Sequence, residues 1–323
     1  GYAALGATTT GSRNTAVGNS ALLNNTTGTS NVAVGVNSLN VNSTGDSNVA
    51  VGRSALQKNT TADNNTAIGH YALEENTTGT NNSAVGANTL DAVTTGSSNS
   101  GFGQGAGGAV TEGDSNTFIG KDAGQSTTTG SFNTGIGSNA LRDYTTGSNG
   151  VAVGINAAIT ATGSNIVAIG ANTLRGGSNN TGSDNVAVGT GALRNSSTGT
   201  QNTALGKDAL YANTTGTRNT AVGTLTLDAN TTANDNTAIG HAALGNNTTG
   251  TQNVAVGRGA SAYNTTADFN TAVGFYALLN ATTGFSNTAI GYTSQQNCTE
   301  GNNNTSLGRE TLFTNTLGDR NVA

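Results

Sequence analysis

The sequence has no proline, methionine or tryptophan, and only one cysteine, among its 323 residues. Charged side chains make up 9% of the chain, whereas about 25% is typical of globular domains. Cys298 cannot form a disulfide within the chain, so cysteine usage does not identify the cellular compartment. The formal net charge of −5 provides no basic surface for nucleic acid. No apolar run approaches the roughly twenty residues that span a membrane, so we expect no membrane contact within this segment.

A short repeat accounts for nearly the whole chain. Blocks such as Asn-Thr-Ala-Val-Gly end in a glycine, here called the anchor glycine, which recurs nineteen times at intervals that are mostly seventeen residues. Two intervals differ: Gly154 to Gly170 is sixteen residues long, and Gly170 to Gly189 is nineteen. The spacing predicts a single repeat array over residues 1–323 with irregular coils at 154–189. We expect the longer coil to bulge outward near Arg175–Ser178 while the side-chain ladders continue.

The residues within each repeat predict an all-β fold. Alternation in Asn-Thr-Ala-Val-Gly is typical of a strand with one buried face, and the later Ala-Leu pair predicts a second short strand. The array is therefore predicted to be a parallel β-solenoid of about nineteen seventeen-residue coils. Valine and leucine are expected inside. An amide ladder is expected from the asparagine that stands four residues before sixteen of the anchor glycines, and five before Gly154 and Gly170. The turn glycines, such as Gly28, are expected at positive φ, with a shifted turn where Ala62-Asp63 replaces the glycine.

The alanine two residues before each anchor glycine is expected to face outward. A flat column of small side chains, including Ala16, Ala33, Ala50 and Ala67, would let another chain approach closely. Burying one valine and one leucine per coil contributes only about 3–6 kcal/mol, which is small beside the entropy of ordering seventeen residues. We therefore expect self-association through this alanine column.

The repeat resembles the head repeats of trimeric autotransporter adhesins, which carry Ser-Val-Ala-Ile-Gly blocks. The matching blocks are Asn14–Gly18, Asn31–Gly35 and Asn65–Gly69. The resemblance implies a left-handed β-roll, a homotrimer, and adhesion to host or matrix surfaces. The period is longer here because each coil has an added Asn-Thr-Thr-Gly turn. Related repeats also occur in phage and virus fibres, so the motif indicates architecture better than it indicates a partner.

The residues contain no catalytic constellation, so we expect no enzyme, no metal and no cofactor. His70 and His241 lie ten coils apart and cannot share a site in one chain. The glycine-rich stretch 101–108 lacks the Lys-Ser/Thr of a phosphate-binding loop. It is instead predicted to be a coil with a depleted core, because Gly107 replaces the usual leucine.

Two kinds of surface site are predicted. The residue after each anchor glycine, here called the variable column, differs from coil to coil as a binding face would, although solvent exposure without selection gives the same variation. Its best patch is Phe275, Tyr276 and Tyr292, because stacked exposed aromatic rings suit carbohydrate or protein contact. N-glycosylation is a further hypothesis for an Asn-x-Ser/Thr column assigned to exposed turns: Asn25, Asn42, Asn59, Asn76, Asn213, Asn230, Asn247 and Asn264.

These observations favour a non-enzymatic extracellular or cell-surface fibre segment. The leading hypothesis is an adhesin head or stalk that associates with itself and binds carbohydrate or a host surface protein. The alternative is a structural subunit of an extracellular filament or phage tail fibre without a specific ligand. Because both ends fall within a repeat, we expect the ladder to continue beyond them.

Overall fold

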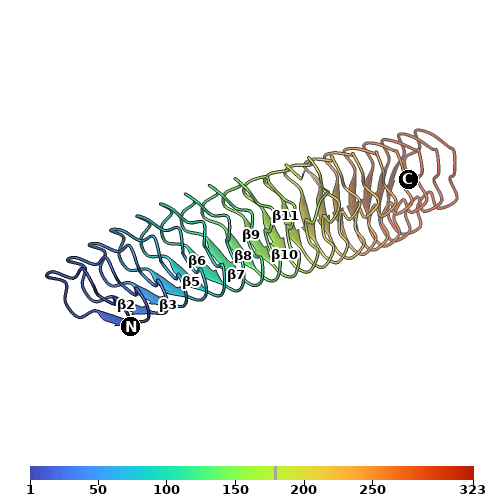
Figure 1. The fold of residues 1–323 in the computed structure, drawn as a ribbon. Coiled ribbons are helices and arrows are strands. Elements are labelled where there is room, and N and C mark those ends of the chain that lie inside the picture. Colours follow the sequence, from blue (N-terminus) through green and yellow to red (C-terminus); the bar gives the residue numbers. More distant parts are fainter. Residues whose placement is uncertain (178–179) are drawn as a thin grey trace. The chain divides into compact units, whose positions relative to one another are not determined.

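The computed structural model describes residues 1–177 and 180–323, and it divides into two units, Gly1–Ser164 and Asn165–Ala323. Within the described residues, the secondary structure consists of eighteen three-residue strands and no helix. Each unit is a parallel β-solenoid with one strand per coil, so the predicted fold class and seventeen-residue repeat are confirmed (Figure 1). Ser178, in the coil that we expect to bulge, lies outside the described residues.

The nine strands of each unit are short and evenly spaced. The first unit contains β1 (Thr15–Val17), β2 (Val32–Val34), β3 (Val49–Val51), β4 (Thr66–Ile68), β5 (Ser83–Val85), β6 (Ser100–Phe102), β7 (Thr117–Ile119), β8 (Thr134–Ile136) and β9 (Val151–Val153). The second contains β10 (Val167–Ile169), β11 (Val186–Val188), β12 (Thr203–Leu205), β13 (Thr220–Val222), β14 (Thr237–Ile239), β15 (Val254–Val256), β16 (Thr271–Val273), β17 (Thr288–Ile290) and β18 (Thr305–Leu307). Neighbouring strands within each unit pair in register, so equivalent residues such as Ala33 and Ala50 lie beside one another.

The Ala-Leu segment is a turn rather than the predicted second strand. Leu22 and Leu39 have φ angles of 53° and 48° in the left-handed region, which costs an L-residue about 1–2 kcal/mol. Hydrogen bonds to the next coil offset this cost: the Leu22 amide donates to the Ser38 carbonyl at 2.9 Å. The leucine side chain then points into the coil and is fully buried. Thus the backbone turns at leucine while its hydrogen bonds continue along the stack.

In these strands the alanine faces the interior and the valine or isoleucine faces outward, which is the reverse of the prediction. Ala33, Ala50 and Ala67 have no exposed surface, so the alanine column faces the leucines in the interior. The aliphatic residue before each anchor glycine faces outward instead, and Ile68 keeps 40% of its surface exposed. Alternation along a strand fixes which residues share a face but does not fix which face is buried. The coil is narrow, so leucine opposite alanine fills it.

The anchor glycine is required by both conformation and space. Gly35 has φ 135°, a region that side chains disfavour, and an added Cβ would lie 2.4 Å from the Gly52 carbonyl oxygen of the next coil. The turn glycine is not required in the same way: Gly28 lacks the predicted positive φ, and Ala62 occupies the equivalent position of another coil. Nor does the turn shift at Ala62, whose carbonyl still accepts the Asn48 amide at 2.8 Å.

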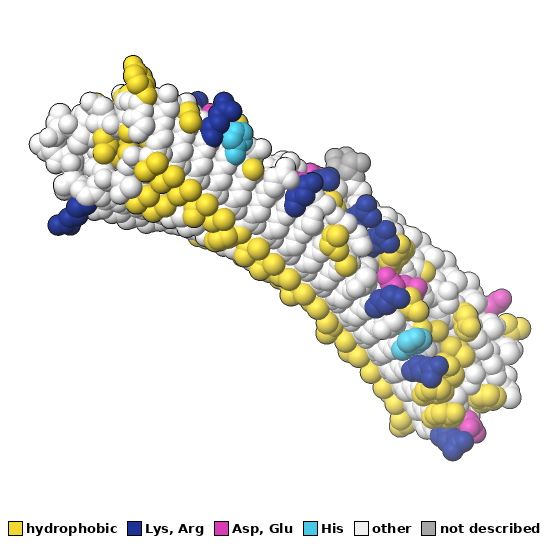
Figure 2. All heavy atoms as spheres, turned by 60° about the horizontal axis from the view of Figure 1, so that its bottom comes forward, with side chains coloured by type: hydrophobic (Ala, Val, Ile, Leu, Met, Phe, Trp, Pro, Cys, Tyr) yellow, Lys and Arg dark blue, Asp and Glu magenta, His cyan; other side chains and the backbone are white. Residues whose placement is uncertain are grey.

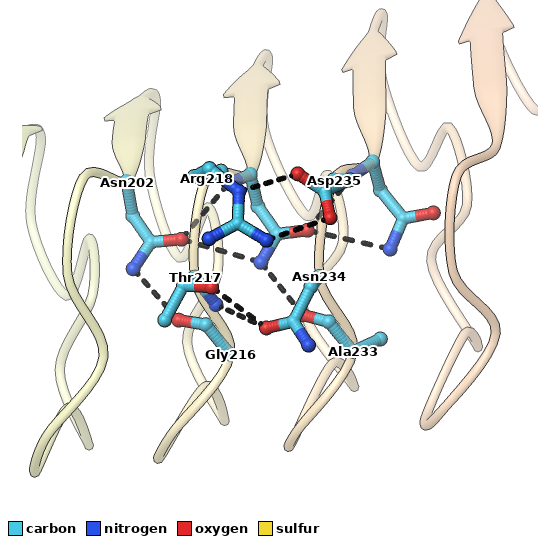
Figure 3. A network of polar contacts seen from close by, with 9 residues as sticks. Asn202, Gly216, Thr217, Arg218, Ala233, Asn234 and Asp235 are labelled. Carbon is cyan, nitrogen blue, oxygen red and sulfur yellow. Dashed lines mark hydrogen bonds and ion pairs between the residues drawn. The ribbon is translucent and has the colours of Figure 1, made fainter.

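Two buried asparagine ladders connect the coils. The strand ladder is the one predicted four residues before most anchor glycines; Gly150 and Ile166 take this position in two coils. The Asn202 side-chain oxygen accepts the Asn219 backbone N–H at 3.0 Å, and the Asn202 side-chain nitrogen donates to the Gly216 carbonyl at 2.8 Å (Figure 3). Each asparagine thus makes two bonds to the coil that follows it in sequence. Outside this ladder, Arg218 forms a bidentate ion pair with Asp235, at 2.6 and 2.9 Å (Figure 3).

The packing around Phe118 accounts for one glycine of the glycine-rich stretch, Gly107. Phe118 takes the position of a core alanine and is fully buried. Gly107 and Gly124 replace leucines in the adjacent turns, and Gly135 replaces the next core alanine. Cβ atoms at Gly107 and Gly135 would lie 3.0 and 3.1 Å from the Phe118 ring. The predicted depletion of the core is therefore wrong, because one phenylalanine fills the space that these glycines leave.

Candidate functional site

The variable column places a row of large side chains on the surface of the second unit. Arg258, Phe275, Tyr292 and Arg309 follow anchor glycines of successive coils. The rings of Phe275 and Tyr292 stack at 5.4 Å between centroids, with planes only 5° apart. The Arg258 guanidinium lies 5.8 Å from the Phe275 ring, and the Arg309 guanidinium 5.3 Å from the Tyr292 ring. Cation–π attraction thus stabilises both ends of the stack.

The structure brings all three predicted aromatic residues together, but it changes how they can act. Phe275 and Tyr276 lie 4.0 Å apart between centroids, with an interplanar angle of 47°. The faces of Phe275 and Tyr292 are taken by each other and by the two arginines, so a ligand can reach only their edges. Tyr276 leans instead over the preceding coil, where an added Cβ on Gly259 would lie 2.5 Å from its ring. Tyr276 also borders a hollow.

This hollow, here called the groove, has a volume of about 410 Å³ and lies wholly in the second unit. Its floor is made by Ala242, Gly245, Gly259 and Ala262, which occupy turn positions in two adjacent coils. The equivalent positions of the coils on either side carry larger side chains: Leu225 with Asp228 at one end, and Tyr276 with Leu279 at the other. The groove exists because two consecutive coils carry small residues between coils that carry large ones.

Polar groups line the groove on every side. His241 and Arg258, both exposed, follow anchor glycines, and Asn246 and Tyr263 lie across the floor from them. Tyr263 keeps 53% of its surface exposed, so its ring is available to a ligand. The cation–π contact with Phe275 restrains the Arg258 side chain at the rim. The groove therefore combines an aromatic wall with hydrogen-bonding groups of several kinds.

Asp228 is the half-buried acid of the groove. Burial raises the pKa of its carboxyl above the ordinary value of 3.8, and the charge of Asp208 raises it further, while backbone N–H groups of Asp228 and Ala229 oppose the shift. Within the described residues, no cation lies within ion-pair distance of this carboxylate. Its oxygens therefore keep hydrogen-bonding capacity toward a ligand.

Two further hollows share residues with the groove. One, of about 380 Å³, is lined by Arg194, Asp208, Tyr211, Leu225 and Asp228. There the Arg194 guanidinium donates to the Tyr211 hydroxyl at 3.1 Å. The other, of about 600 Å³, is lined by Asn246, Tyr263, Thr265, Asn280, Thr282 and Thr299. Asp228 and Tyr263 thus each border two hollows, and the recessed surface extends over several coils of the second unit.

The groove was not predicted from the sequence, because it is formed by small side chains, whereas the predicted sites consist of large ones. The signal was nevertheless present: when the repeats are aligned, two successive coils have alanine or glycine at the second and fifth positions after the anchor glycine. Elsewhere the fifth position holds residues such as Gln57, Arg142 and Tyr211.

The premise of the glycosylation hypothesis is wrong. The structure gives zero exposure to all eight predicted asparagines: Asn25, Asn42, Asn59, Asn76, Asn213, Asn230, Asn247 and Asn264. They form a second ladder, in which the Asn59 side-chain nitrogen donates to the Asn42 side-chain oxygen at 2.7 Å and to the Ala62 carbonyl at 3.0 Å. A glycan would have to remove the amide from this ladder, so the folded coil and the modification exclude each other. Cys298 occupies the same column and is also buried.

Other features of the described residues add no further chemistry. They include no group of three or more histidine, cysteine or acidic side chains placed to hold a metal ion. The rings of His70 and Tyr71 in the first unit lie 3.9 Å apart between centroids, whereas His241 lines the groove of the second unit. Over residues 1–177 and 180–323, no helix is long and apolar enough to cross a membrane.

Comparisons with known proteins leave the family open. No protein-family model matches the chain, and the search of curated proteins found no match either.

Proposed function

We propose that the chain is a segment of a non-enzymatic extracellular fibre that associates with itself through the outward face of its strands, as an adhesin head or stalk. The observation that carries this proposal is a row of exposed and half-exposed aliphatic and aromatic side chains, one per coil, in each unit (Figure 2). It is here called the outer column. Ile68, Phe102 and Ile119 keep 40%, 42% and 40% of their surface exposed in the first unit. In the second, Ile169, Leu205 and Ile239 keep 40%, 47% and 41%.

The outer column is more apolar than a solvated surface requires. Fully burying one such side chain contributes about 1.5–3 kcal/mol, so covering the exposed two fifths contributes roughly 1 kcal/mol per coil. Four of the nine coils of the first unit carry a less exposed valine in this column, so one unit would contribute roughly 5–9 kcal/mol to association before its costs. A contiguous exposed apolar surface of this kind is typical of an interaction site.

The regular spacing favours a second copy of this chain as the partner. Residues of the outer column are spaced by the hydrogen-bonding distance between strands, about 4.8 Å. A partner with the same spacing matches every coil, whereas an irregular surface matches only a few. Self-association was expected through the alanine column, but that column is interior, so the outer column replaces it as the proposed contact. A homotrimer is our first choice and a filament the second.

The adhesin is favoured over a purely structural fibre by the groove. A structural filament or phage tail fibre subunit needs no recessed surface lined by aromatic and charged groups. This alternative remains the second candidate, because most outward positions of the repeat carry small polar residues that specify no ligand.

The self-association is tested with charge on the outer column. Ile68→Glu with Val85→Glu places two carboxylates in adjacent coils of the proposed contact. The control, Thr61→Glu with Thr78→Glu, adds the same charge at exposed turn positions of the same region. Light scattering after size exclusion should give an oligomer for the unmodified chain and the control, and a lower mass for the outer-column variant with unchanged circular dichroism. A folded, monomeric unmodified chain would refute the proposal.

A further inference from the structure

We propose that the groove of the second unit is a binding site for a neutral saccharide. This inference deepens the proposed adhesin function by naming the chemical class of its ligand. The volume of about 410 Å³ lies within the roughly 300–1,000 Å³ that is usual for small-molecule sites. A single ring of a glycan can therefore enter while the rest of the chain extends into the two hollows that share its residues.

The lining has the two kinds of surface that a sugar ring requires. A pyranose presents C–H groups on its faces and hydroxyl groups around its edge. Tyr263 and Tyr276 provide aromatic surface for the C–H groups. The Asp228 carboxylate can accept hydrogen bonds from hydroxyl groups, Arg258 can donate them, and Asn246 can do both.

The charges of the groove favour a neutral ligand. Asp228 is acidic, Arg258 is basic, and both line the same 410 Å³. An anionic sugar or a phosphate would approach the Asp228 carboxylate, and a cationic ligand would approach the Arg258 guanidinium, so either bears a repulsive contact. A neutral polyhydroxylated ring pairs with both groups at once.

The small floor is the feature that makes the site specific to this place in the repeat. Ala262 is 8% exposed, at a position where other coils carry long side chains such as Gln57 and Gln125. Ala262→Gln should therefore fill the groove with a side chain that the fold accepts at this position. Asp228→Asn preserves the shape but removes the charge.

Matched controls exist in the first unit, at the same turn position. Asp91, like Asp228, is half-buried, and burial raises its pKa as well. Asp91→Asn is thus the control for Asp228→Asn. Gly108→Gln is the control for the filled groove, because a Cβ there would meet its nearest atom, in the Asp91 carboxylate, at 3.4 Å.

The experiment uses the intact chain and named sugars. Maltotriose, cellotriose, lactose and diacetylchitobiose are the neutral probes, and sialyllactose is the anionic one. Saturation-transfer NMR identifies binders, and isothermal titration calorimetry measures their affinity. We expect at least one neutral probe to bind. Ala262→Gln and Asp228→Asn should each weaken it tenfold or more, and Asp91→Asn and Gly108→Gln should leave it within twofold.

Several outcomes would overturn the inference. These are binding of no neutral probe, binding of sialyllactose alone, or neutral binding that Ala262→Gln leaves unchanged. None of them affects the oligomeric mass, which tests the proposed fibre independently. Conversely, a monomeric chain that binds a neutral sugar at the groove would support this site and refute the proposed fibre.

Discussion

Phe118 offers the sharpest test of how the coils are packed. The residue usual in its column is alanine, so a comparison of repeats would suggest that Phe118→Ala makes the coil more regular. The structure predicts the reverse. The ring occupies the interior of the coil, and its neighbours Gly107, Gly124 and Gly135 have no side chains that could move into the vacated space. Removing the ring therefore leaves a cavity that cannot collapse easily.

The expected cost follows from the size of that cavity. Phenylalanine-to-alanine substitutions in cores lower the free energy of unfolding by about 3–5 kcal/mol. A second substitution, Gly124→Leu, should lower the free energy of unfolding when Phe118 is present and raise it when Phe118 is replaced by alanine. Gly124→Leu alone should destabilise, because its Cβ would overlap the Phe118 ring. In the Phe118→Ala background the same leucine should restore stability, because other coils hold leucine at this position with a similar φ, near 50° against 60° at Gly124.

Urea denaturation followed by circular dichroism gives the free energies for the four chains of this double-mutant cycle. Because a solenoid can unfold in parts, amide exchange of residues in β7 should be measured alongside. The coupling should be several kcal/mol and favourable. If Gly124→Leu destabilised both backgrounds equally, the complementary packing of Phe118 and Gly124 would be refuted.

Asn236→Ala should cost about 2–4 kcal/mol in urea denaturation, because the buried N–H of Asn253 loses its acceptor and the Gly250 carbonyl keeps only its bond from Asn247. A cost near zero would show that the strand ladder is not a stabilising element. Because the pKa of Asp228 is raised, the folded chain holds this proton to a higher pH than the unfolded chain does. The free energy of unfolding should therefore fall as pH rises from below 3.8 through the raised pKa. Asp228→Asn should accordingly raise the urea midpoint at pH 7 but not at pH 3, and a lower midpoint at pH 7 would contradict this. Burial also raises the pKa of the Cys298 thiol, so iodoacetamide at pH 8 should alkylate the native chain roughly tenfold or more slowly than the chain in urea, and equal rates would count against burial.

Asp228→Asn also separates sugar binding from folding. The same substitution is expected to stabilise the fold at pH 7 and to weaken sugar binding. A loss of affinity in a more stable chain cannot be attributed to misfolding.

The sequence predicted the architecture because the repeat constrains the fold in many independent copies. The period, the parallel stacking and the strand asparagine ladder all follow from residues that recur in register. The orientation of each strand was wrong because Thr-Ala-Val alternates equally well in either direction. Hydrophobicity favoured valine inside, but the interior of one coil has room for only one large side chain per turn, and leucine takes it.

The turn was harder to predict than the strand. Left-handed leucine is rare for steric reasons, so an Ala-Leu pair gave no reason to expect φ near 50° at Leu22. The turn asparagines resembled exposed acceptor sites because Asn-Thr-Thr-Gly combines an Asn-x-Thr triplet with a glycine typical of turns. Their burial depends on the next coil, whose carbonyls and amides complete the ladder. The groove likewise depends on two adjacent coils that both lack large side chains at the same turn positions. No single residue of the repeat indicates this.

The strand asparagines give the stack a direction. Each one receives an N–H from the coil that follows it and donates to a carbonyl of that same coil, as Asn202 does with Asn219 and Gly216. A finished coil therefore presents a preset acceptor and donor to the segment synthesised next. On a ribosome, that segment emerges only after the coil that it must join. If coils dock as they are synthesised, the order of translation is the order in which these sites are occupied, and each coil would act as the template for its successor.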